Sequence, residues 1–315
     1  MPFILQPIQR VKIMIYDVVI IGGGPAGLTA GIYAKRAMLN TVLLEKMGVG
    51  GQIIVTELVE NFPGFQEISG AELARKFEQQ ARKFGLETKS MVEVAGIEDR
   101  GKTKLVKTSE GDFETKTVII TTGTTPKKLG AKSELEFTGR GVSYCATCDS
   151  FFFRDKTVVV VGGGDSAIIE AIFLTKMAKK VIVVHRRDKL RAEKINQEHA
   201  FSNPKISFVW DSVIEEVAGK QVVEKVVVRN VKTNEVSEIK TDGVFIYVGL
   251  IPNTGFANVK KDEWGFIITN DNRETSVKGI FAAGDCRVTP LRQIVTAVGD
   301  GAIAAVSAER YIEGL

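Results

Sequence analysis

The chain contains two similar arrangements of an apolar run followed by a glycine-rich turn. The run Tyr16 to Ile21 is rich in β-branched residues and leads into a turn that begins at Gly22, with a helical pattern over Leu28 to Met38. Much later, Thr157 to Val161 leads into an equivalent turn that begins at Gly162, with a helical pattern over Ala167 to Met177. A buried strand, a Gly-x-Gly-x-x-Gly or Ala turn and a helix are typical of a dinucleotide-binding βαβ unit. The pattern therefore predicts an α/β protein with two Rossmann-like dinucleotide-binding domains.

The ends of the two units indicate that the second domain is inserted into the first. The run Val118 to Thr122 is followed by Gly123, and the run Val244 to Val248 is followed by Gly249. The chain after Pro252 is too short for a third ordinary domain, so we expect it to return to the first. The prediction is one discontinuous domain over residues 1–126 and 253–315, and an inserted domain over residues 127–252.

Composition and charge exclude several classes of protein. The 315 residues are 44% hydrophobic and 25% charged, as in an ordinary globular enzyme. The net charge is +4, and no long Lys/Arg run suggests nucleic-acid binding. No apolar run approaches the roughly 18 residues that a membrane span needs. We therefore expect a cytoplasmic protein, with Met1 to Met14 as a short extension.

The residue at the end of the second strand distinguishes the two turns. Counting 23 positions from Gly22 leads to Glu45, whose carboxylate can accept hydrogen bonds from a ribose. The same count from Gly162 leads to His185, which we expect to orient and pack rather than to catalyse. The first site is therefore predicted to hold a dinucleotide with a free 2′-hydroxyl.

A cationic cluster follows His185 and predicts NADPH at the second site. The cluster consists of Arg186, Arg187 and Arg191. Guanidinium groups present planar sets of donors that suit a phosphate dianion such as the 2′-phosphate. Two dinucleotides in one chain imply chemistry between them, so we expect a flavin, FAD, at the Glu45 site. Gly284 and Asp285 after a strand support this prediction, because an acid in that place is typical of flavoproteins.

Cys145 and Cys148 form a Cys-x-x-Cys followed by Asp149. Such a pair is either redox-active or half of a metal site. A zinc site would need two more ligands, and the only other cysteine and histidines are Cys286, His185 and His199. We therefore predict a redox pair and no metal.

These motifs together resemble the low-molecular-weight thioredoxin reductases, from about Ile15 to the end of the chain. The motifs that carry the resemblance are GGGPAG at 22–27, GGQ at 50–52, ENFPG at 60–64, CATCD at 145–149, GGGDSA at 162–167, HRRDKLRA at 185–192, GLIPN at 249–253, AAGD at 282–285 and RQ at 292–293. The resemblance implies FAD, NADPH, a homodimer and thioredoxin as the protein substrate. It also implies that electrons pass from NADPH through FAD to the Cys145–Cys148 disulfide, and then to thioredoxin. Asp149 is the expected proton donor.

The predicted site residues fall into three groups. The catalytic group is Cys145, Cys148 and Asp149. The FAD group is Gly22, Gly24, Pro25, Ala26, Gly27, Glu45, Gly51, Gln52, Asn61, Gly123, Asp285, Arg292, Gln293 and Ile294. The NADPH group is Gly162, Gly164, Asp165, Ser166, His185, Arg186, Arg187 and Arg191.

Other functions stay open at this point. One is a related flavoprotein that is reduced by ferredoxin, or that serves a glutaredoxin-like or peroxiredoxin-coupled acceptor. Another is a flavin-bound redox sensor without turnover. The HRRDKLRA motif argues against ferredoxin as the donor, and the intact CATCD motif argues against a sensor.

Overall fold

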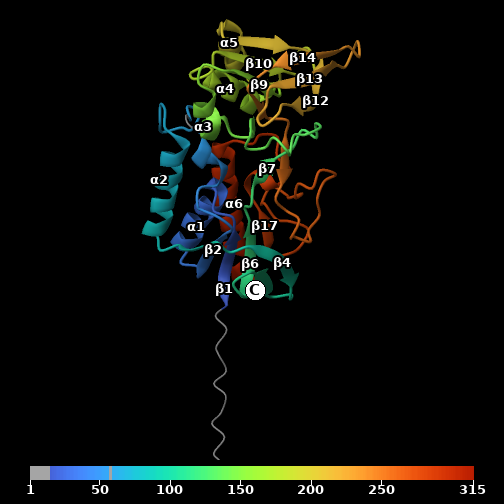
Figure 1. The fold of residues 1–315 in the computed structure, drawn as a ribbon. Helices are drawn as coiled ribbons and strands as arrows, with labels where there is room; N and C mark the ends of the chain where they lie inside the picture. The colour runs from blue at the N-terminus through green and yellow to red at the C-terminus, as the bar shows by residue number, and fades with distance from the viewer. Residues whose placement is uncertain (1–14, 57–58) are drawn as a thin grey trace, which may run out of the picture. The chain divides into compact units, whose positions relative to one another are not determined.

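The computed structural model describes residues 15–56 and 59–315, and the predicted extension Met1 to Met14 lies outside the described residues. The chain divides into two compact units (Figure 1). Unit 1 contains the described residues up to Thr124 and Pro252–Leu315, and unit 2 contains Thr125–Ile251. Which dinucleotide each unit binds stays a prediction.

Unit 1 is built on a seven-stranded sheet with the order β3-β2-β1-β6-β5-β4, in which β17 also pairs with β6. The parallel strands are β1 (Tyr16–Ile21), β2 (Thr41–Glu45), β3 (Glu87–Ser90), β6 (Phe113–Ile120) and β17 (Ile280–Ala282). The antiparallel strands are β4 (Val94–Asp99) and β5 (Lys104–Thr108). The helices are α1 (Pro25–Arg36), α2 (Gly70–Lys83) and α6 (Ile294–Glu313), with short 3₁₀ turns η1 (Gly51–Val55) and η3 (Gly284–Cys286).

Alternating side chains of β1 cover the two faces of this sheet. Val18 and Ile20 are buried in a cluster with residues of α1 and α6, whereas Val19 and Ile21 are buried in a cluster on the other face. Successive side chains of a strand point to opposite faces, so a run that is apolar throughout indicates a strand covered on both sides. This explains why the run Tyr16 to Ile21 contains so few polar residues.

Unit 2 repeats this design with a five-stranded parallel sheet in the order β11-β10-β9-β15-β8. Its strands are β8 (Val142–Ser143), β9 (Thr157–Val161), β10 (Lys180–Val184), β11 (Ile206–Val209) and β15 (Gly243–Ile246). Its helices are α3 (Ala146–Asp149), α4 (Asp165–Leu174) and α5 (Lys194–Ser202), with the 3₁₀ turn η2 (Ser150–Phe153). A separate antiparallel sheet contains β12 (Ser212–Ala218), β13 (Lys225–Asn230) and β14 (Val236–Lys240).

The two connections between the units run side by side. They form the strands β7 (Thr124–Pro126) and β16 (Leu250–Pro252), which pair as a two-stranded sheet. Beyond this ribbon, the Lys127 N–H donates to the Gly249 carbonyl at 2.9 Å, and the Asn253 N–H donates to the Gly123 carbonyl at 3.0 Å. The two crossings are therefore joined by backbone hydrogen bonds.

The C-terminal segment returns to unit 1, as the sequence predicts. Strand β17 pairs with β6 in parallel, with Ile280 opposite Val118, and α6 packs against α1. The approach of these helices is close, because a Cβ on Gly301 would lie 2.2 Å from the Ala26 carbonyl oxygen. Gly301 therefore permits α6 to pack closely against α1 in unit 1.

Several predicted element boundaries are wrong by a few residues. The first helix begins at Pro25 rather than Leu28, because proline has the backbone angle of a helix and suits its first turn. The strand predicted over Val118 to Thr122 ends at Ile120, where the Thr121 hydroxyl binds the Ile21 and Gly22 carbonyls instead. Helix α4 begins at Asp165 rather than Ala167.

No helix in residues 15–56 or 59–315 is both long and apolar enough to cross a bilayer.

A buried ion-pair network ties α6 to the turn after β17. The Asp300 side chain is only 7% exposed and accepts hydrogen bonds from Arg273 Nε at 2.8 Å and Arg287 Nε at 2.5 Å. It also accepts the Gly284 backbone N–H at 3.0 Å. Burial alone would raise the pKa of Asp300, but Arg287, Gly284 and Arg273 together hold this pKa below its usual value.

We predict that Asp300→Ala lowers the free energy of unfolding by about 3–5 kcal/mol, because it leaves two largely buried guanidinium groups, 16% and 12% exposed, without their carboxylate. Urea unfolding followed by circular dichroism would measure this loss, with the exposed Asp271→Ala as the control.

A carboxyl group whose pKa falls on folding stabilises the fold above its unfolded pKa, and this contribution is lost in acid. The difference between Asp300→Ala and wild type should therefore shrink below about pH 4. An equal difference at acid and neutral pH would contradict this role.

Candidate cofactor and redox sites

The first glycine turn, after β1, depends on contacts that a side chain would prevent. Gly22 has φ +109°, and a Cβ on Gly27 would lie 1.9 Å from the Gly22 carbonyl oxygen. Gly24, in contrast, faces open space, since the nearest atom to its Cβ position is the Gly51 Cα at 3.9 Å. No side chain of the described residues caps α1, which starts with Pro25 and Ala26. An open helix N-terminus beside an open glycine suits the pyrophosphate of a dinucleotide.

Glu45 lies at the end of β2, beside this turn. Its Oε2 accepts the Gly23 N–H at 2.6 Å, and its Oε1 accepts the Met47 N–H at 2.9 Å. Each carboxylate oxygen has a further lone pair, so both can still accept a hydrogen bond. These two bonds fix the carboxylate in the place where the sequence predicts recognition of a ribose.

The segment from Gly50 to Gln52 lies against the same turn. The Gly50 N–H donates to the Gly23 carbonyl at 2.8 Å, which places Gly51 next to Gly24. The Gln52 side-chain amide donates to the Thr124 carbonyl at 2.5 Å. The predicted FAD residues Gly51 and Gln52 are therefore brought together with the glycine turn.

Asn61 and Gln293 are far apart in sequence but adjacent in unit 1. The Asn61 amide donates to Gln293 Oε1 at 3.2 Å. Gln293 also caps α6 through a reciprocal pair of hydrogen bonds with Thr296, directly before Ile294. Both predicted flavin-contacting amides are thus held at the start of one helix.

Asp285 and Arg292 lie beside this helix start. The Arg292 Nε donates to the Asp285 carbonyl at 3.4 Å, and its guanidinium carbon lies 4.1 Å from the centre of the Phe266 ring. Burial raises the pKa of Asp285, Arg292 opposes this effect and Asp300 adds to it. Gly123, with φ +60°, lies at the end of the chain segment that leaves β6.

The second glycine turn, after β9, has the same open geometry. Gly162 has φ +146°, and a Cβ there would lie 2.4 Å from the Tyr247 carbonyl oxygen. Gly164 has no atom within 4 Å of its Cβ position, and no side chain of the described residues caps α4. This turn can therefore receive a second pyrophosphate. Ser166, in the first turn of α4, is exposed.

The Asp165 side chain is held by hydrogen bonds within unit 2. Its Oδ1 accepts the Glu193 N–H at 2.7 Å and the Asn196 side-chain amide at 3.1 Å. These bonds join the start of α4 to the start of α5. A cofactor-binding role for Asp165 stays a prediction.

His185 is buried at the end of β10 and its ring packs over Gly163. A Cβ on Gly163 would lie 2.4 Å from the imidazole Cε1, and Nε2 lies 3.1 Å from the Lys189 carbonyl oxygen. Burial lowers the pKa of His185, the Lys189 carbonyl opposes this effect, and the charges of the cationic cluster lower the pKa further. These effects together favour the neutral form of the imidazole.

The cationic cluster has no counter-charge of its own in the part of the chain that the structure describes. Arg186, Arg187 and Arg191 are exposed, and none forms an ion pair with a described carboxylate. The carboxylate of the nearby Asp188 instead pairs with Lys232, with 3.5 Å between Asp188 Oδ2 and Lys232 Nζ. An array of free guanidinium groups beside an open glycine turn fits a phosphorylated ribose.

Cys145 is disulfide-bonded, whereas Cys286 is free and fully buried. Burial raises the pKa of the Cys286 thiol to about 12, which keeps it unreactive. The backbone of Cys148 lies in α3, but its side chain is outside the described part of the structure. Asp149 is the last residue of α3, and its N–H donates to the Cys145 carbonyl at 3.3 Å.

Sequence reasoning missed Tyr247, which lies next to this redox segment. The Ala146 N–H, directly after Cys145, donates to the Tyr247 hydroxyl at 2.8 Å. Tyr247 follows β15, about a hundred residues later in the chain. An apolar strand that ends in tyrosine is a weak signal, so only the fold reveals this contact.

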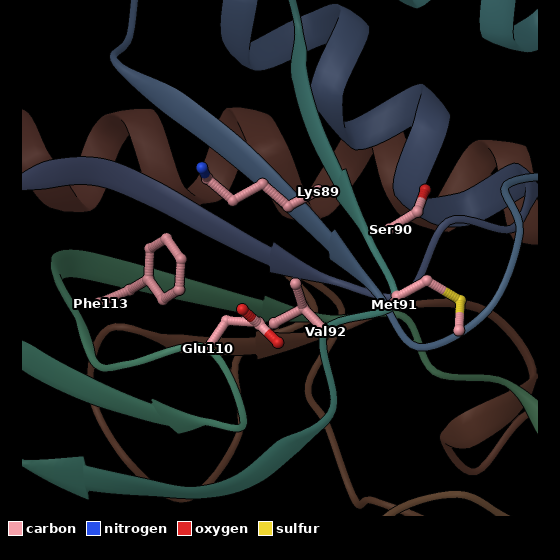
Figure 2. A pocket seen from close by; sticks show the side chains of 6 residues that line it. All are labelled: Lys89, Ser90, Met91, Val92, Glu110 and Phe113. Atoms are coloured by element: carbon pink, nitrogen blue, oxygen red, sulfur yellow. The ribbon is translucent and has the colours of Figure 1, made fainter.

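A cavity of about 540 Å³ in unit 1 is distinct from the predicted site residues (Figure 2). It is lined by Lys89, Ser90, Met91, Val92, Glu110 and Phe113. The Val92 N–H donates to the Glu45 carbonyl at 3.0 Å, so the cavity lies beside the end of β2. No group of three His, Cys, Asp or Glu residues that could hold a metal occurs within residues 15–56 and 59–315.

Comparison with known proteins agrees with this arrangement. Residues 16–301 match the family model of pyridine nucleotide-disulphide oxidoreductases. The chain belongs to this family. The pyridine nucleotide-disulphide oxidoreductases to which it is similar include thioredoxin reductases of known sequence and structure.

Two curated relatives and one solved structure define this similarity. The thioredoxin reductase of Peptoclostridium acidaminophilum is 48% identical over 308 residues, covering 95% of this chain and 98% of the relative. The thioredoxin reductase of Bacillus subtilis (strain 168) is 49% identical over 308 residues, covering 96% of each chain. The structure of the Lactococcus lactis thioredoxin reductase in its FR conformation has 47% identity and a TM-score of 0.93, covering 95% of this chain and 100% of that one. The predicted resemblance and fold class are confirmed.

We predict that Arg186→Ala combined with Arg187→Ala raises the KM for NADPH and changes the KM for NADH much less. Each lost charge-assisted contact with the 2′-phosphate should cost on the order of 1.5–3 kcal/mol. Steady-state oxidation of each coenzyme measures this effect.

The matched control is Lys179→Ala with Lys180→Ala, which removes two exposed charges at the opposite end of β10. Equal weakening of NADPH and NADH, or an equal effect in the control, would show that the cluster does not recognise the 2′-phosphate.

Proposed function

We propose that this chain is an NADPH-dependent thioredoxin reductase. It transfers electrons from NADPH through FAD and the Cys145–Cys148 disulfide to oxidised thioredoxin. The observation that carries this proposal is a disulfide-bonded Cys145 in the same unit as an open glycine turn and an exposed arginine cluster, which forms no ion pair with the described carboxylates. The names of relatives with 48–49% identity over nearly the whole chain support the same activity.

The residues of each turn fit the cofactor that the family implies. Gly22, Gly24 and Glu45 would hold the adenosine and pyrophosphate of FAD, with Asp285 towards its ribitol. Gly162, Gly164 and the cationic cluster would hold NADPH. When bound, FAD supplies an acceptor for the NADPH hydride and a two-electron donor for a disulfide.

Thiol–disulfide exchange with thioredoxin is the step that the chain's own cysteines would perform. Cys145 is disulfide-bonded and Cys286 is free, and the resemblance to thioredoxin reductases makes Cys148 the proposed partner of Cys145. After reduction, a thiolate of the pair would attack the thioredoxin disulfide and form a mixed disulfide, which the second cysteine resolves. Two thiols of the enzyme become a disulfide, and the thioredoxin disulfide becomes two thiols. Asp149 would donate a proton to a leaving thiolate.

Thioredoxin is the proposed protein substrate, and a homodimer is the proposed assembly. We also propose a cytoplasmic location, because a low and odd number of cysteines does not suit a secreted disulfide framework.

The alternatives differ from this proposal in the electron donor or acceptor. A flavoprotein reduced by ferredoxin would not need a 2′-phosphate site, whereas the arginine cluster fits one. A glutaredoxin-like or peroxiredoxin-coupled acceptor would use the same pair, and a redox sensor would show no turnover.

We predict that Cys145→Ser and Cys148→Ser each abolish thioredoxin reduction but leave flavin reduction by NADPH largely intact. In the proposed order, the hydride step comes before the cysteines. Anaerobic mixing with NADPH follows the flavin through its visible absorbance, and a coupled assay follows thioredoxin reduction.

Cys286→Ala is the control for the cysteine variants, and it should retain thioredoxin reduction. Turnover in either serine variant would remove the pair from the mechanism. A wild-type protein whose flavin is reduced by NADPH but which reduces no protein disulfide would favour the sensor.

An exposed aromatic pair follows the redox segment in η2. Phe151 and Phe152 are each 67% exposed, with ring centroids 6.3 Å apart. Exposed aromatic side chains beside a reactive group often anchor a protein partner. We infer that this pair contributes to the thioredoxin-binding surface.

We predict that Phe151→Ala with Phe152→Ala lowers kcat/KM for thioredoxin about 30-fold, equivalent to about 2 kcal/mol of binding energy. Reduction of a small aromatic disulfide, which needs no docking surface, should change little. Phe201→Ala, which removes another exposed ring of unit 2, is the matched control. Equal losses with thioredoxin and with the small disulfide would assign the phenylalanines to the pair itself and not to docking.

A further inference from the structure

Tyr247 supplies a buried hydrogen-bond acceptor to the backbone between the two cysteines. Ala146 is 0% exposed, so its N–H has no access to water. The Tyr247 hydroxyl accepts this N–H at 2.8 Å. A buried backbone N–H is almost always paired, and here the partner is a side chain from a different strand end.

This hydrogen bond fixes the backbone after Cys145, and the backbone before Cys145 is fixed as well. The Cys145 N–H donates to the Ser143 hydroxyl at 3.0 Å, and that hydroxyl donates to the Cys145 carbonyl at 3.2 Å. Ser143 therefore fixes the chain before α3, and Tyr247 fixes its first residue. Together these bonds define the backbone conformation on both sides of Cys145.

The surroundings of Tyr247 keep its hydroxyl neutral. Burial raises the pKa of the phenol, the carboxylate of Glu170 on α4 and that of Asp149 on α3 add to this effect, and the Ala146 N–H opposes it. A neutral phenol can accept the Ala146 N–H while it keeps its own proton.

We propose that Tyr247 is a positioning residue of the redox centre, and that its hydroxyl stabilises the disulfide form of the Cys145–Cys148 pair over the dithiol form. This inference rests on the proposed function. In the oxidised protein the disulfide pins the segment, so an unpaired Ala146 N–H could not move into water. In the reduced protein the segment can relax and find another partner for this group.

Loss of the hydroxyl therefore penalises the disulfide form more than the dithiol form. Stabilisation of the disulfide makes the dithiol a stronger reductant. Tyr247 would thus increase the driving force for reduction of thioredoxin, in which two electrons and two protons leave the pair as its disulfide forms.

The test compares Tyr247→Phe with wild type as the FAD-loaded holoenzyme. Each protein is equilibrated without oxygen in a series of dithiothreitol buffers, free thiols are alkylated, and both cysteines are quantified by peptide mass. The expected result is an equilibrium constant shifted about tenfold towards the dithiol, a rise in reduction potential of about 30 mV. An unchanged or lower potential would overturn the proposal.

Tyr144→Phe is the matched control, because it removes another half-buried tyrosine's hydroxyl, one residue before Cys145. That hydroxyl donates to Glu134 Oε1 at 2.5 Å rather than to the Ala146 backbone. It should lower the stability of unit 2 without a comparable change in potential. Equal shifts in both variants would show a nonspecific effect and would also overturn the proposal.

A second variant keeps the test decisive if Tyr247→Phe does not fold. It carries 4-fluorophenylalanine at position 247, which fills the space without a hydroxyl, and should give the same shift. The readout uses neither NADPH nor thioredoxin. A wild-type pair that does not exchange with dithiothreitol would therefore contradict the proposed function, whereas an exchanging pair with no shift in the variants would contradict only the role of Tyr247.

Discussion

The absence of a Cβ at the strand-to-helix turns is the constraint on which both predicted dinucleotide sites depend. At Gly22 and Gly162 the chain turns at positive φ, directly against a backbone carbonyl of the neighbouring strand connection. At Gly27 the helix backbone passes so close to Gly22 that a methyl group could not fit. Because the chain turns so tightly, each helix starts at the carboxyl end of its strand with its N–H groups open. An anion can then approach both helix ends without a side chain in its way.

The two turns share their geometry but differ in the charge placed beside them. Glu45 and His185 occupy the same position relative to their turns, and each packs over the second glycine, Gly23 or Gly163. Glu45 brings a carboxylate that two backbone N–H groups orient. His185 brings a ring whose neutral form is favoured, and the arginines beyond it bring positive charge without a counter-ion among the described residues. One backbone design therefore favours a free ribose hydroxyl in one unit and a phosphate in the other.

The sequence was sufficient for features that depend on local pattern. Strands such as β1 and β9 are short apolar runs between glycine-rich turns, and an acidic or basic residue at a fixed offset follows from the βαβ unit itself. Contacts that depend on tertiary packing were not predictable in this way. Asp300, Arg273 and Arg287 meet only when α6 packs against the turn after β17. Tyr247 meets Ala146 only when β15 enters the sheet beside β9. Helix starts were misplaced because Pro25 and Asp165 belong both to the glycine turn and to the helix.

The environments of Cys145 and Cys286 differ in the way that the proposed exchange at Cys145 and an inert Cys286 require. Cys286 lies in the apolar cluster behind β1 and β6, where burial disfavours a thiolate and the pKa rises to about 12. Its thiol lies near the Ile120 and Ala283 carbonyls, which can accept a hydrogen bond from the thiol but cannot stabilise a thiolate. Cys145 instead precedes a one-turn helix in a half-buried segment, where Ser143 and Tyr247 satisfy the backbone groups on either side. A sulfur that exchanges with a protein substrate must be reachable and yet rigidly placed. The Ser143 and Tyr247 hydroxyls can place such a sulfur rigidly, because they fix the backbone on either side of it through hydrogen bonds.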